Sequence, residues 1–257
     1  MTTALVGGAS AGLGAAIAER LAAAGNDLLL WSRSAERLDP IAVKLHERYG
    51  VKVNTVAADA ADPTAAATVA DRAQEIFGGV DICVLNAGGP PPATADQTNA
   101  DDWRKALQLL TITPIDLATR LLPGMRERGH GRIIAVLSSG VREPLPNLTY
   151  SNSGRAALAA WIKTAGREVA ADGVTVNGVV PGRIDTDRVA QLDAAAAKRT
   201  GTDPEKVRAA SIATIPAGRY GNPEEFAAVV GFLAGRESSY VTASLLSCDG
   251  GLMRSMT

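Results

Sequence analysis

The sequence predicts an α/β fold in which helices cover both faces of a doubly wound parallel sheet, giving three α/β/α layers. Two observations lead to this prediction. Short apolar runs of strand length alternate with longer stretches of helical period along the chain, and this alternation is typical of parallel βαβ units. The chain also has 257 residues, of which 46% are hydrophobic, and this fits one large domain with a sizeable core. We therefore expect residues 1–257 to form a single domain.

The expected strands are short apolar runs that end in glycine or polar residues. They cover Thr3–Val6, Asp27–Trp31, Val51–Ala57, Val80–Leu85, Arg132–Leu137, Val174–Val180 and Leu245–Ser247. The expected helices show helical spacing of apolar residues, and they cover Gly12–Ala24, Ser34–Tyr49, Asp62–Phe77, Ala100–Arg128, Ser151–Ala171 and Pro223–Ala234. Gly25 ends the first helix, and Ser34 is a candidate N-cap of the second.

The stretch Asp185–Ala217 interrupts this alternation and is rich in Ala, Thr and charged residues. We interpret it as an insertion, at about residues 185–217, that forms a lid over the substrate. In doubly wound sheets, ligands bind outside the carboxyl ends of the strands. Functional residues are therefore expected just after Val6, Trp31, Leu85, Leu137 and Val180.

The charge and the cysteine content argue against several classes of protein. A formal net charge of −1 gives no field that attracts nucleic acid or an anionic membrane. No apolar run approaches the length that spans a bilayer, and the chain starts without a basic leader, so a cytoplasmic protein is expected. Cys83 and Cys248 lie in apolar runs and are expected to be buried thiols. No clustered ligands indicate a metal site, and none is predicted.

A glycine-rich turn joins the first strand to the first helix. Gly8, Gly12 and Gly14 allow a tight turn and a close approach of the backbone to a pyrophosphate at the positive helix N-terminus. This position in the chain indicates a Rossmann-type dinucleotide site. A P-loop is excluded, because no Lys-Ser/Thr pair follows the glycines.

The end of the second strand predicts which dinucleotide binds. A carboxylate there would bind the ribose hydroxyls of NAD, but the sequence is Trp31-Ser32-Arg33-Ser34. Arg33, with the hydroxyls of Ser10 and Ser32, offers donors for a 2′-phosphate. The sequence therefore predicts NADP(H) rather than NAD(H). The alternative is that Arg33 only solvates the strand end.

Several motifs, in order along nearly the whole chain, resemble the short-chain dehydrogenase/reductase family, and in particular its 3-oxoacyl-carrier-protein-reductase-like members. The motifs are the glycine turn (with Gly7 where Thr is usual), Asp59, Asn86-Ala87-Gly88, Val176–Gly182 with Thr186, Pro223-Glu224-Glu225 and Asp249-Gly250-Gly251. The resemblance implies cofactor contacts at Gly8, Ser10, Gly12, Leu13, Gly14, Ser32, Arg33, Asp59, Ala60, Asn86, Ala87, Gly88, Arg155, Pro181, Gly182, Ile184 and Thr186.

The resemblance also implies catalysis by Asn, Ser, Tyr and Lys, and here the chain departs from the family pattern. Ser151 stands at the Tyr position, Arg155 at the Lys position and Leu110 at the Asn position. The serine of the family pattern is present as Ser139, and Ser138 beside it is the other candidate for this serine. A serine hydroxyl is a far weaker acid than the Tyr phenol, whose reference pKa is about 10, and Arg155 does not shuttle protons.

The proton donor therefore stays open between Ser151, Tyr150 and a bound water. Tyr150 precedes Ser151 by one residue, which rotates its direction by about 100° if the position is helical. Its alternative role is to pack beside the cleft. The proline-rich loop Gly89–Pro92 either stiffens a wall of the substrate pocket or is only a rigid connector.

Two functions are consistent with this pattern. The first is an NADP(H)-dependent oxidoreductase that transfers hydride between the nicotinamide and a carbonyl or alcohol of a small substrate. The second is a catalytically degenerate dinucleotide-binding protein, which serves as a sensor or a partner subunit. The small residues of the helix from Ser151 (Ala156, Ala157, Ala159 and Ala160) favour a homo-oligomer, a dimer or a tetramer. The alternative is that this face packs on its own sheet.

Overall fold

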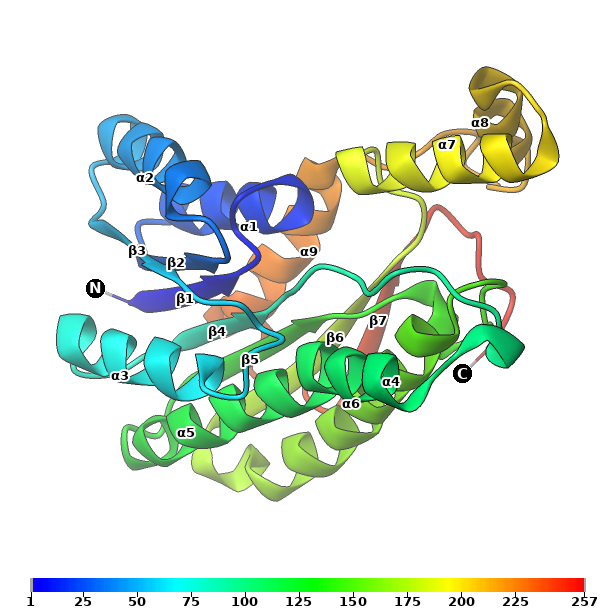
Figure 1. Cartoon of the computed structure of the whole chain (residues 1–257). Coiled ribbons are helices and arrows are strands. Elements are labelled where there is room, and N and C mark those ends of the chain that lie inside the picture. Colours follow the sequence, from blue (N-terminus) through cyan, green and yellow to red (C-terminus); the bar gives the residue numbers. More distant parts are fainter. Residues whose placement is uncertain (1, 257) are drawn as a thin grey trace.

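The computed structural model describes residues 2–256, and within them seven strands form one parallel sheet (Figure 1). The strands are β1 (Thr3–Gly7), β2 (Asp27–Ser32), β3 (Val53–Ala57), β4 (Ile82–Leu85), β5 (Gly131–Val136), β6 (Val174–Pro181) and β7 (Leu245–Cys248). Their order across the sheet is β3-β2-β1-β4-β5-β6-β7, and every neighbouring pair runs parallel. The predicted doubly wound fold is confirmed, with its topological switch between β1 and β4.

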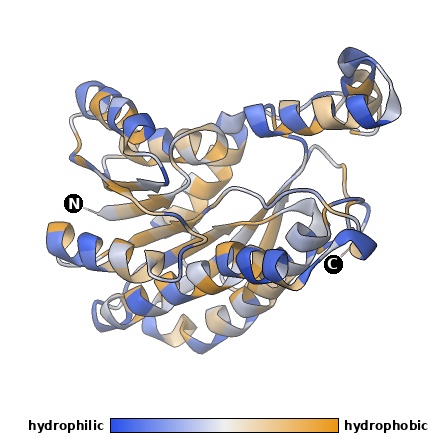
Figure 2. Cartoon of the chain, in the orientation of Figure 1, coloured by the Kyte–Doolittle hydropathy of each residue, from blue (hydrophilic) through white to orange (hydrophobic). Residues whose placement is uncertain are grey.

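Helices cover both faces of this sheet (Figure 1). One face carries α1 (Gly12–Ala23), α2 (Ala35–Tyr49) and α9 (Pro223–Ala234), and the other carries α3 (Ala65–Phe77), α4 (Ala100–Leu107), α5 (Thr113–Glu127) and α6 (Thr149–Glu168). The buried residues of the strands are mostly apolar, and the outer sides of the helices are hydrophilic (Figure 2). This is the pattern of a parallel sheet that is buried on both faces. None of the described helices has the length and apolarity to cross a bilayer.

The long helix predicted over Ala100–Arg128 is interrupted by a π-helical turn at Gln108–Ile112. The sequence gives a reason, because Pro114 has no backbone N–H to donate to the carbonyl four residues earlier. The hydroxyl of Thr111 points out of the turn and donates to the backbone carbonyl of Gly154 in α6, at 2.8 Å. The π turn therefore fixes α4 and α5 against α6 beside the cleft.

Several element boundaries differ from the prediction by one to three residues, and two differences at helix starts concern residues of the cleft. Helix α6 begins at Thr149, two residues earlier than expected, so Tyr150 lies in its first turn. The side chain of Ser34 makes no capping hydrogen bond to the backbone of α2, and its hydroxyl instead donates to Glu36 at 3.1 Å. Ser34 is thus at the N-cap position, but the predicted side-chain cap does not form.

The insertion expected at about 185–217 is helical. It contains α7 (Asp187–Thr200) and α8 (Pro204–Ala213), which project away from the two helical layers (Figure 1). Thr186 caps α7 by accepting a hydrogen bond from the backbone N–H of Val189, and Asp203 caps α8 by accepting one from Glu205. Gly201 adopts a left-handed conformation, with φ of 64°, and ends α7.

A buried carboxylate holds this helical pair to the rest of the chain. Asp193 of α7 is only 5% exposed, and it accepts hydrogen bonds from Arg183 at 3.1 Å and from the Tyr220 hydroxyl at 2.8 Å. Arg208 of α8 pairs with Asp185 at 2.7 Å and lies 4.4 Å from the centre of the Tyr220 ring. A buried charge needs its partners, so this cluster fixes α7 over the segment that follows β6.

Removing one bond of this cluster tests its role. Tyr220→Phe deletes the hydroxyl that donates to Asp193, and a hydrogen bond to a charged group contributes ~1.5–3 kcal/mol. We expect the backbone amides of α7 to exchange about 10-fold faster or more, because the lid opens locally, while the melting temperature changes little. Tyr240→Phe is the control, because Tyr240 is fully exposed. Unchanged α7 exchange in Tyr220→Phe would contradict this role of Asp193.

Candidate active site

A cleft of about 1430 Å³ runs along the carboxyl ends of the strands. Its lining includes residues that follow β1, β2, β3, β4, β5 and β6, at 8, 10–14, 31–34, 58–61, 86–92, 136–139 and 181–184. This confirms the expectation that the functional segments meet at one edge of the sheet. All the residues predicted from the sequence to contact cofactor or substrate line this cleft, although the contact that each one makes stays a prediction.

The glycine turn is packed closely against the end of β4. Gly8 has φ of 59°, and a Cβ on Gly14 would lie 2.1 Å from the Gly8 carbonyl oxygen, so neither position accommodates a side chain without a shift. The Asn86 side-chain amide donates to the Gly7 carbonyl at 3.0 Å. A Cβ on Gly7 would lie 2.5 Å from the Asn86 carbonyl oxygen, which explains a glycine where Thr is usual in the family. Asn86 therefore fixes the glycine turn to the end of β4.

The first turn of α1 is open to an anion. Its N-cap is Ala11, which has no side chain that caps the helix, and the first turn carries no acidic residue. The free backbone N–H groups and the positive end of the helix dipole then face the cleft. The glycine cradle and this helix end together fit the pyrophosphate of a dinucleotide.

The adenosine end of the cleft is formed by residues after β2 and β3. Arg33 and Arg37 both line it, and within residues 2–256 no carboxylate forms an ion pair with either. The Trp31 indole N–H donates to the Ala58 carbonyl at 2.8 Å, which ties β2 to the loop after β3. Asp59 accepts from the backbone N–H of Ala61, which shapes that loop. Two guanidinium groups without a partner fit a 2′-phosphate.

The sequence analysis missed Arg37 and Trp31. Arg37 lies four residues after Arg33, at the start of α2. This spacing of two arginines is the sequence feature that could have indicated a second cation for the 2′-phosphate. Trp31 reads in the sequence only as a strand residue, because no adjacent residue distinguishes a side chain that lines the cleft from one in the core.

Three serines lie at the other end of the cleft. Ser138 accepts a hydrogen bond from the backbone N–H of Gly140 at 3.2 Å, which caps the short 3₁₀ turn Ser139–Val141. The hydroxyls of Ser139 and Ser151 make no hydrogen bond with any residue that the structure describes, although both side chains line the cleft. Ser139 and Ser151 are therefore the hydroxyls that are free to meet a ligand.

Arg155 lies one helical turn after Ser151 and points toward the ends of β4 and β5. It donates to the Val136 carbonyl at 2.6 Å and to the Ala87 carbonyl at 3.4 Å. Burial, reinforced by the charge of Arg188, lowers the pKa of the Arg155 guanidinium to about 10. Arg155 therefore stays protonated at neutral pH and supplies a fixed positive charge inside the cleft.

Tyr150 is held by contacts on the side of α4. Its side chain is 3% exposed, its hydroxyl accepts from the backbone N–H of Asn99 at 3.0 Å, and its ring meets the Trp103 ring edge-on at 4.8 Å between centres. The position is helical, as the expected rotation of about 100° from Ser151 requires. This geometry favours the alternative in which Tyr150 packs beside the cleft.

Leu110 occupies the centre of the π turn and is 1% exposed. A Cβ on Gly154 would lie 3.1 Å from the Leu110 Cβ, so the two helices touch at this point. An apolar side chain here closes off the place where the family pattern has an amide. Leu110 therefore adds packing between the helices and no polar group for a water.

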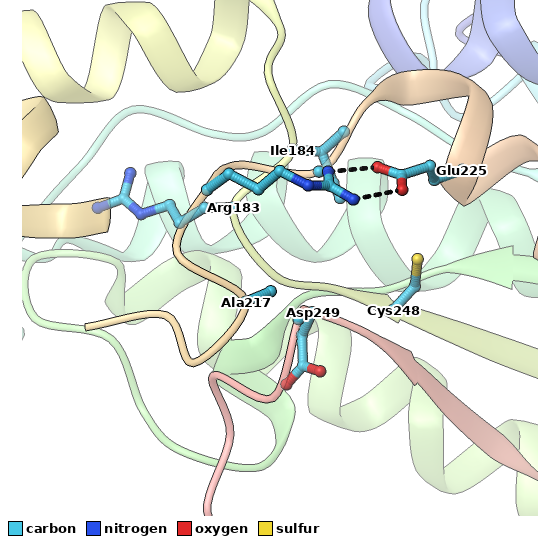
Figure 3. Close-up of a pocket in the computed structure, with 9 residues that line it drawn as sticks. Arg183, Ile184, Ala217, Glu225, Cys248 and Asp249 are labelled. Carbon is cyan, nitrogen blue, oxygen red and sulfur yellow. Dashed lines mark hydrogen bonds and ion pairs between the residues drawn. The ribbon is translucent and has the colours of Figure 1, made fainter. Parts of the chain in front are cut away.

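A second, smaller cavity of about 110 Å³ lies under residues 183–184 (Figure 3). Glu225 receives two hydrogen bonds from Arg219 there, at 2.7 and 2.8 Å, and these bonds lower the pKa of Glu225 to about 2. Glu225 also completes a capping box with Asn222 at the start of α9. The Cys248 side chain points into this cavity (Figure 3). Cys83 is buried as predicted, but Cys248 is only half-buried, because β7 is the edge strand of the sheet.

Comparison with known proteins identifies the family. A family model described as enoyl-(acyl carrier protein) reductase matches residues 8–253. The chain therefore belongs to the short-chain dehydrogenase/reductase family.

Individual relatives cover nearly the full length of the chain. The NADPH-dependent reductase BacG of Bacillus subtilis (strain 168) is 31% identical over 255 residues, which cover 99% of this chain and 98% of BacG. The 3-oxoacyl-(acyl-carrier-protein) reductase FabG of Vibrio cholerae is 34% identical over 251 residues, which cover 97% and 96%. The structure of L-sorbose reductase from Gluconobacter frateurii, complexed with NADPH and L-sorbose, matches with a TM-score of 0.94 and 34% identity over 99% of this chain and 97% of that one. These relatives agree with the predicted oxidoreductase class and with the predicted cofactor.

The cofactor preference can be tested at Arg33. Arg33→Ala removes one of the two guanidinium groups at the adenosine end, and a hydrogen bond to a charged group contributes ~1.5–3 kcal/mol. We expect the NADPH dissociation constant to rise about 10-fold or more. The NADH dissociation constant, measured by the same fluorescence titration, should stay nearly constant, because NADH has no 2′-phosphate. Equal losses for both dinucleotides would mean that Arg33 does not read the 2′-phosphate.

Proposed function

We propose that this short-chain dehydrogenase/reductase is an NADP(H)-dependent oxidoreductase that converts a carbonyl substrate to its alcohol or the reverse. One observation carries the proposal. A single cleft brings the dinucleotide-binding segments together with two free hydroxyls, on Ser139 and Ser151, and one fixed cation, on Arg155. Its relatives include NADPH-dependent reductases of the same length.

When bound, NADPH supplies the hydride, and the chain supplies orientation and polarisation. We assign Arg155 to the nicotinamide ribose, and its position supports this role, because the guanidinium lies at the ends of β4 and β5 and keeps further N–H donors. Ser139 is placed to donate a hydrogen bond to the carbonyl oxygen of the substrate, which lowers the energy of the developing alkoxide. The hydroxyl of Ser138 is already engaged with Gly140, so we assign the role to Ser139.

The proton that completes the alcohol needs a different source. A serine hydroxyl is a poor acid, and Arg155, with a pKa of about 10, keeps its proton at neutral pH. Tyr150 has its hydroxyl against the backbone of Asn99. We therefore assign the proton to a water that Ser151 holds by a hydrogen bond in the cleft, and the hydroxide left behind takes up a proton from the solvent that enters the cleft.

The rest of the chain fits this role. We propose that α7 and α8 form the substrate lid of a single domain in the cytoplasm, anchored through Asp193. We also propose a homo-oligomer in which α6 packs against its counterpart, because Ala156, Ala157 and Ala160 of α6 are exposed rather than packed on their own sheet. Small exposed side chains allow two helices to approach closely.

The catalytic assignment predicts a ranking of variants. In a screen of NADPH oxidation with a broad carbonyl panel, Ser139→Ala is expected to lower kcat by ~10²–10³, as for loss of one donor to a developing oxyanion. Ser138→Ala and Tyr150→Phe should change kcat only a few-fold. The reverse ranking, with Tyr150→Phe inactive, would make Tyr150 the proton donor.

The same screen separates the proposal from its alternative. NADPH binding without turnover of any substrate, with turnover restored by Ser151→Tyr together with Arg155→Lys, would favour a dinucleotide-binding sensor or partner subunit. Binding is measured separately by fluorescence titration.

The oligomer is tested on the exposed face of α6. Ala157→Arg places a long cation where two helices would meet, and we expect a smaller particle than wild type in light scattering. Ala23→Arg, at an exposed position near the end of α1, should leave the mass unchanged. A wild-type mass for Ala157→Arg would place the contact elsewhere.

A further inference from the structure

Two arginines face the substrate end of the cleft from different helices. Arg155 reaches in from α6 and is fixed by the carbonyls of Val136 and Ala87. Arg188 reaches in from α7, and its guanidinium lies against Gly89. A Cβ on Gly89 would lie 3.1 Å from Nη2 and 3.7 Å from Cζ of Arg188. Both cations therefore flank the loop that follows Asn86-Ala87-Gly88.

Neither guanidinium has a carboxylate partner among residues 2–256. Of the acids on the lid segment, Asp185 pairs with Arg208 and Asp193 with Arg183, while Asp187, which precedes Arg188 in the chain, pairs with no described cation. The positive charge of Arg188 is one of the two causes that lower the pKa of Arg155. Two like charges in a partly buried cleft repel each other, so an anion between them would be stabilised.

The wider lining of the cleft has the same sign. Helices α4, α6 and α7 contribute four cations and two carboxylates to it: Lys105, Arg155, Arg188 and Arg199 against Asp102 and Asp187. The excess positive charge favours an anionic ligand and raises its local concentration.

The anionic groups of the dinucleotide are provided for elsewhere in the cleft. The N-terminus of α1 fits the pyrophosphate, and Arg33 with Arg37 fits the 2′-phosphate. Arg188 instead lies on Gly89, beyond the segment Asn86-Ala87-Gly88 and beside the proline loop Pro90–Pro92. An anion bound at Arg188 would therefore be a group of the substrate rather than of the dinucleotide.

We propose that Arg188 binds a carboxylate of the substrate, with Arg155 as a second positive charge behind it, so that the enzyme acts on oxo acids. The planar guanidinium offers two parallel N–H donors that match the two oxygens of a carboxylate. Gly89 has no side chain, which leaves room for the Arg188 guanidinium beside the backbone. This inference rests on the proposed oxidoreductase function.

Arg188 also links the substrate to the lid. It lies in the first turn of α7, and the cluster around Asp193 holds the same helix. A carboxylate bound at Arg188 would therefore add a contact between the substrate and the proposed lid.

The first experiment compares acids with their neutral esters. NADPH oxidation is measured with pyruvate, acetoacetate and levulinate and with the methyl ester of each, at constant ionic strength. We expect kcat/KM for at least one acid to exceed that of its ester about 10-fold or more, as a charge-assisted pair predicts.

Arg188→Gln should bring this ratio of acid to ester close to one. Its NADPH dissociation constant should stay within two-fold of wild type, which also shows that the variant is folded. Lys198→Gln removes a charge from an exposed position of the same helix and should keep the ratio.

The second experiment needs no turnover. Binding of succinate, dimethyl succinate and inorganic phosphate to the NADP⁺-saturated protein is measured by calorimetry. We expect succinate to bind wild type and Lys198→Gln, and to bind Arg188→Gln about 10-fold more weakly, while dimethyl succinate does not bind.

The outcomes separate the two proposals. Turnover that is indifferent to the charge of the substrate overturns the carboxylate assignment and leaves the oxidoreductase function intact. Succinate binding that depends on Arg188, without turnover of any compound, supports the carboxylate site and refutes the proposed function. Arg188-dependent binding of phosphate but not of succinate, or a large loss of NADPH affinity in Arg188→Gln, overturns the assignment of Arg188 to a substrate carboxylate.

Discussion

The close approach of the first turn to the end of β4 is the constraint on which the rest of the site depends. Gly7, Gly8 and Gly14 leave no room for side chains at this point, and the Asn86 amide bonds to the Gly7 carbonyl beneath them. β1 and β4 are the two central strands at which the order of the sheet reverses. A rigid contact between their ends fixes the N-terminus of α1 relative to Ala87, the residue against which Arg155 is oriented. The contact between the glycine turn and Asn86 thus fixes the cofactor end of the cleft relative to the end that contains Arg155.

The replacements that the family resemblance implies at positions 110, 151 and 155 form a consistent group in chemical terms. A lysine at position 155 would have an ordinary pKa of about 10.4, and the burial that lowers the pKa of Arg155 would bring it closer to neutrality. Such a cation suits a neighbouring tyrosine that must give up its proton. If Ser151 stands at the tyrosine position, as the family resemblance implies, Arg155 has no such neighbour, and the permanently charged guanidinium suits the ribose-binding role that we propose for it. Leu110, which the resemblance aligns with the family's amide, is a buried apolar side chain and offers no polar group in the same region.

Most of the fold and the positions of the site residues could be predicted from the sequence, because both depend on local patterns. Buried apolar runs mark the strands, and the sheet topology then places their ends together. The π turn at Gln108–Ile112 could not be predicted, because it depends on Pro114 and on a contact between Thr111 and α6. The direction of Tyr150 depends likewise on Asn99 and Trp103, which are distant in the sequence. Arg188 lies in a segment that no motif marks, and its significance appears only when Gly89 and Arg155 are seen beside it.

If α7 and α8 form the substrate lid that we propose, their anchoring also affects how quickly bound molecules can leave. Asp193 is almost completely buried and accepts hydrogen bonds from Arg183 and Tyr220. Arg208 stacks on the Tyr220 ring, so α7, α8 and the segment after β6 are all connected through this cluster. Opening α7 requires water to reach this carboxylate, and such local openings are slow compared with diffusion. Departure of a ligand from beneath α7 would then be set by the opening frequency of the lid rather than by the ligand's own affinity. In that case product release limits the turnover rate, and a faster hydride-transfer step would not raise kcat.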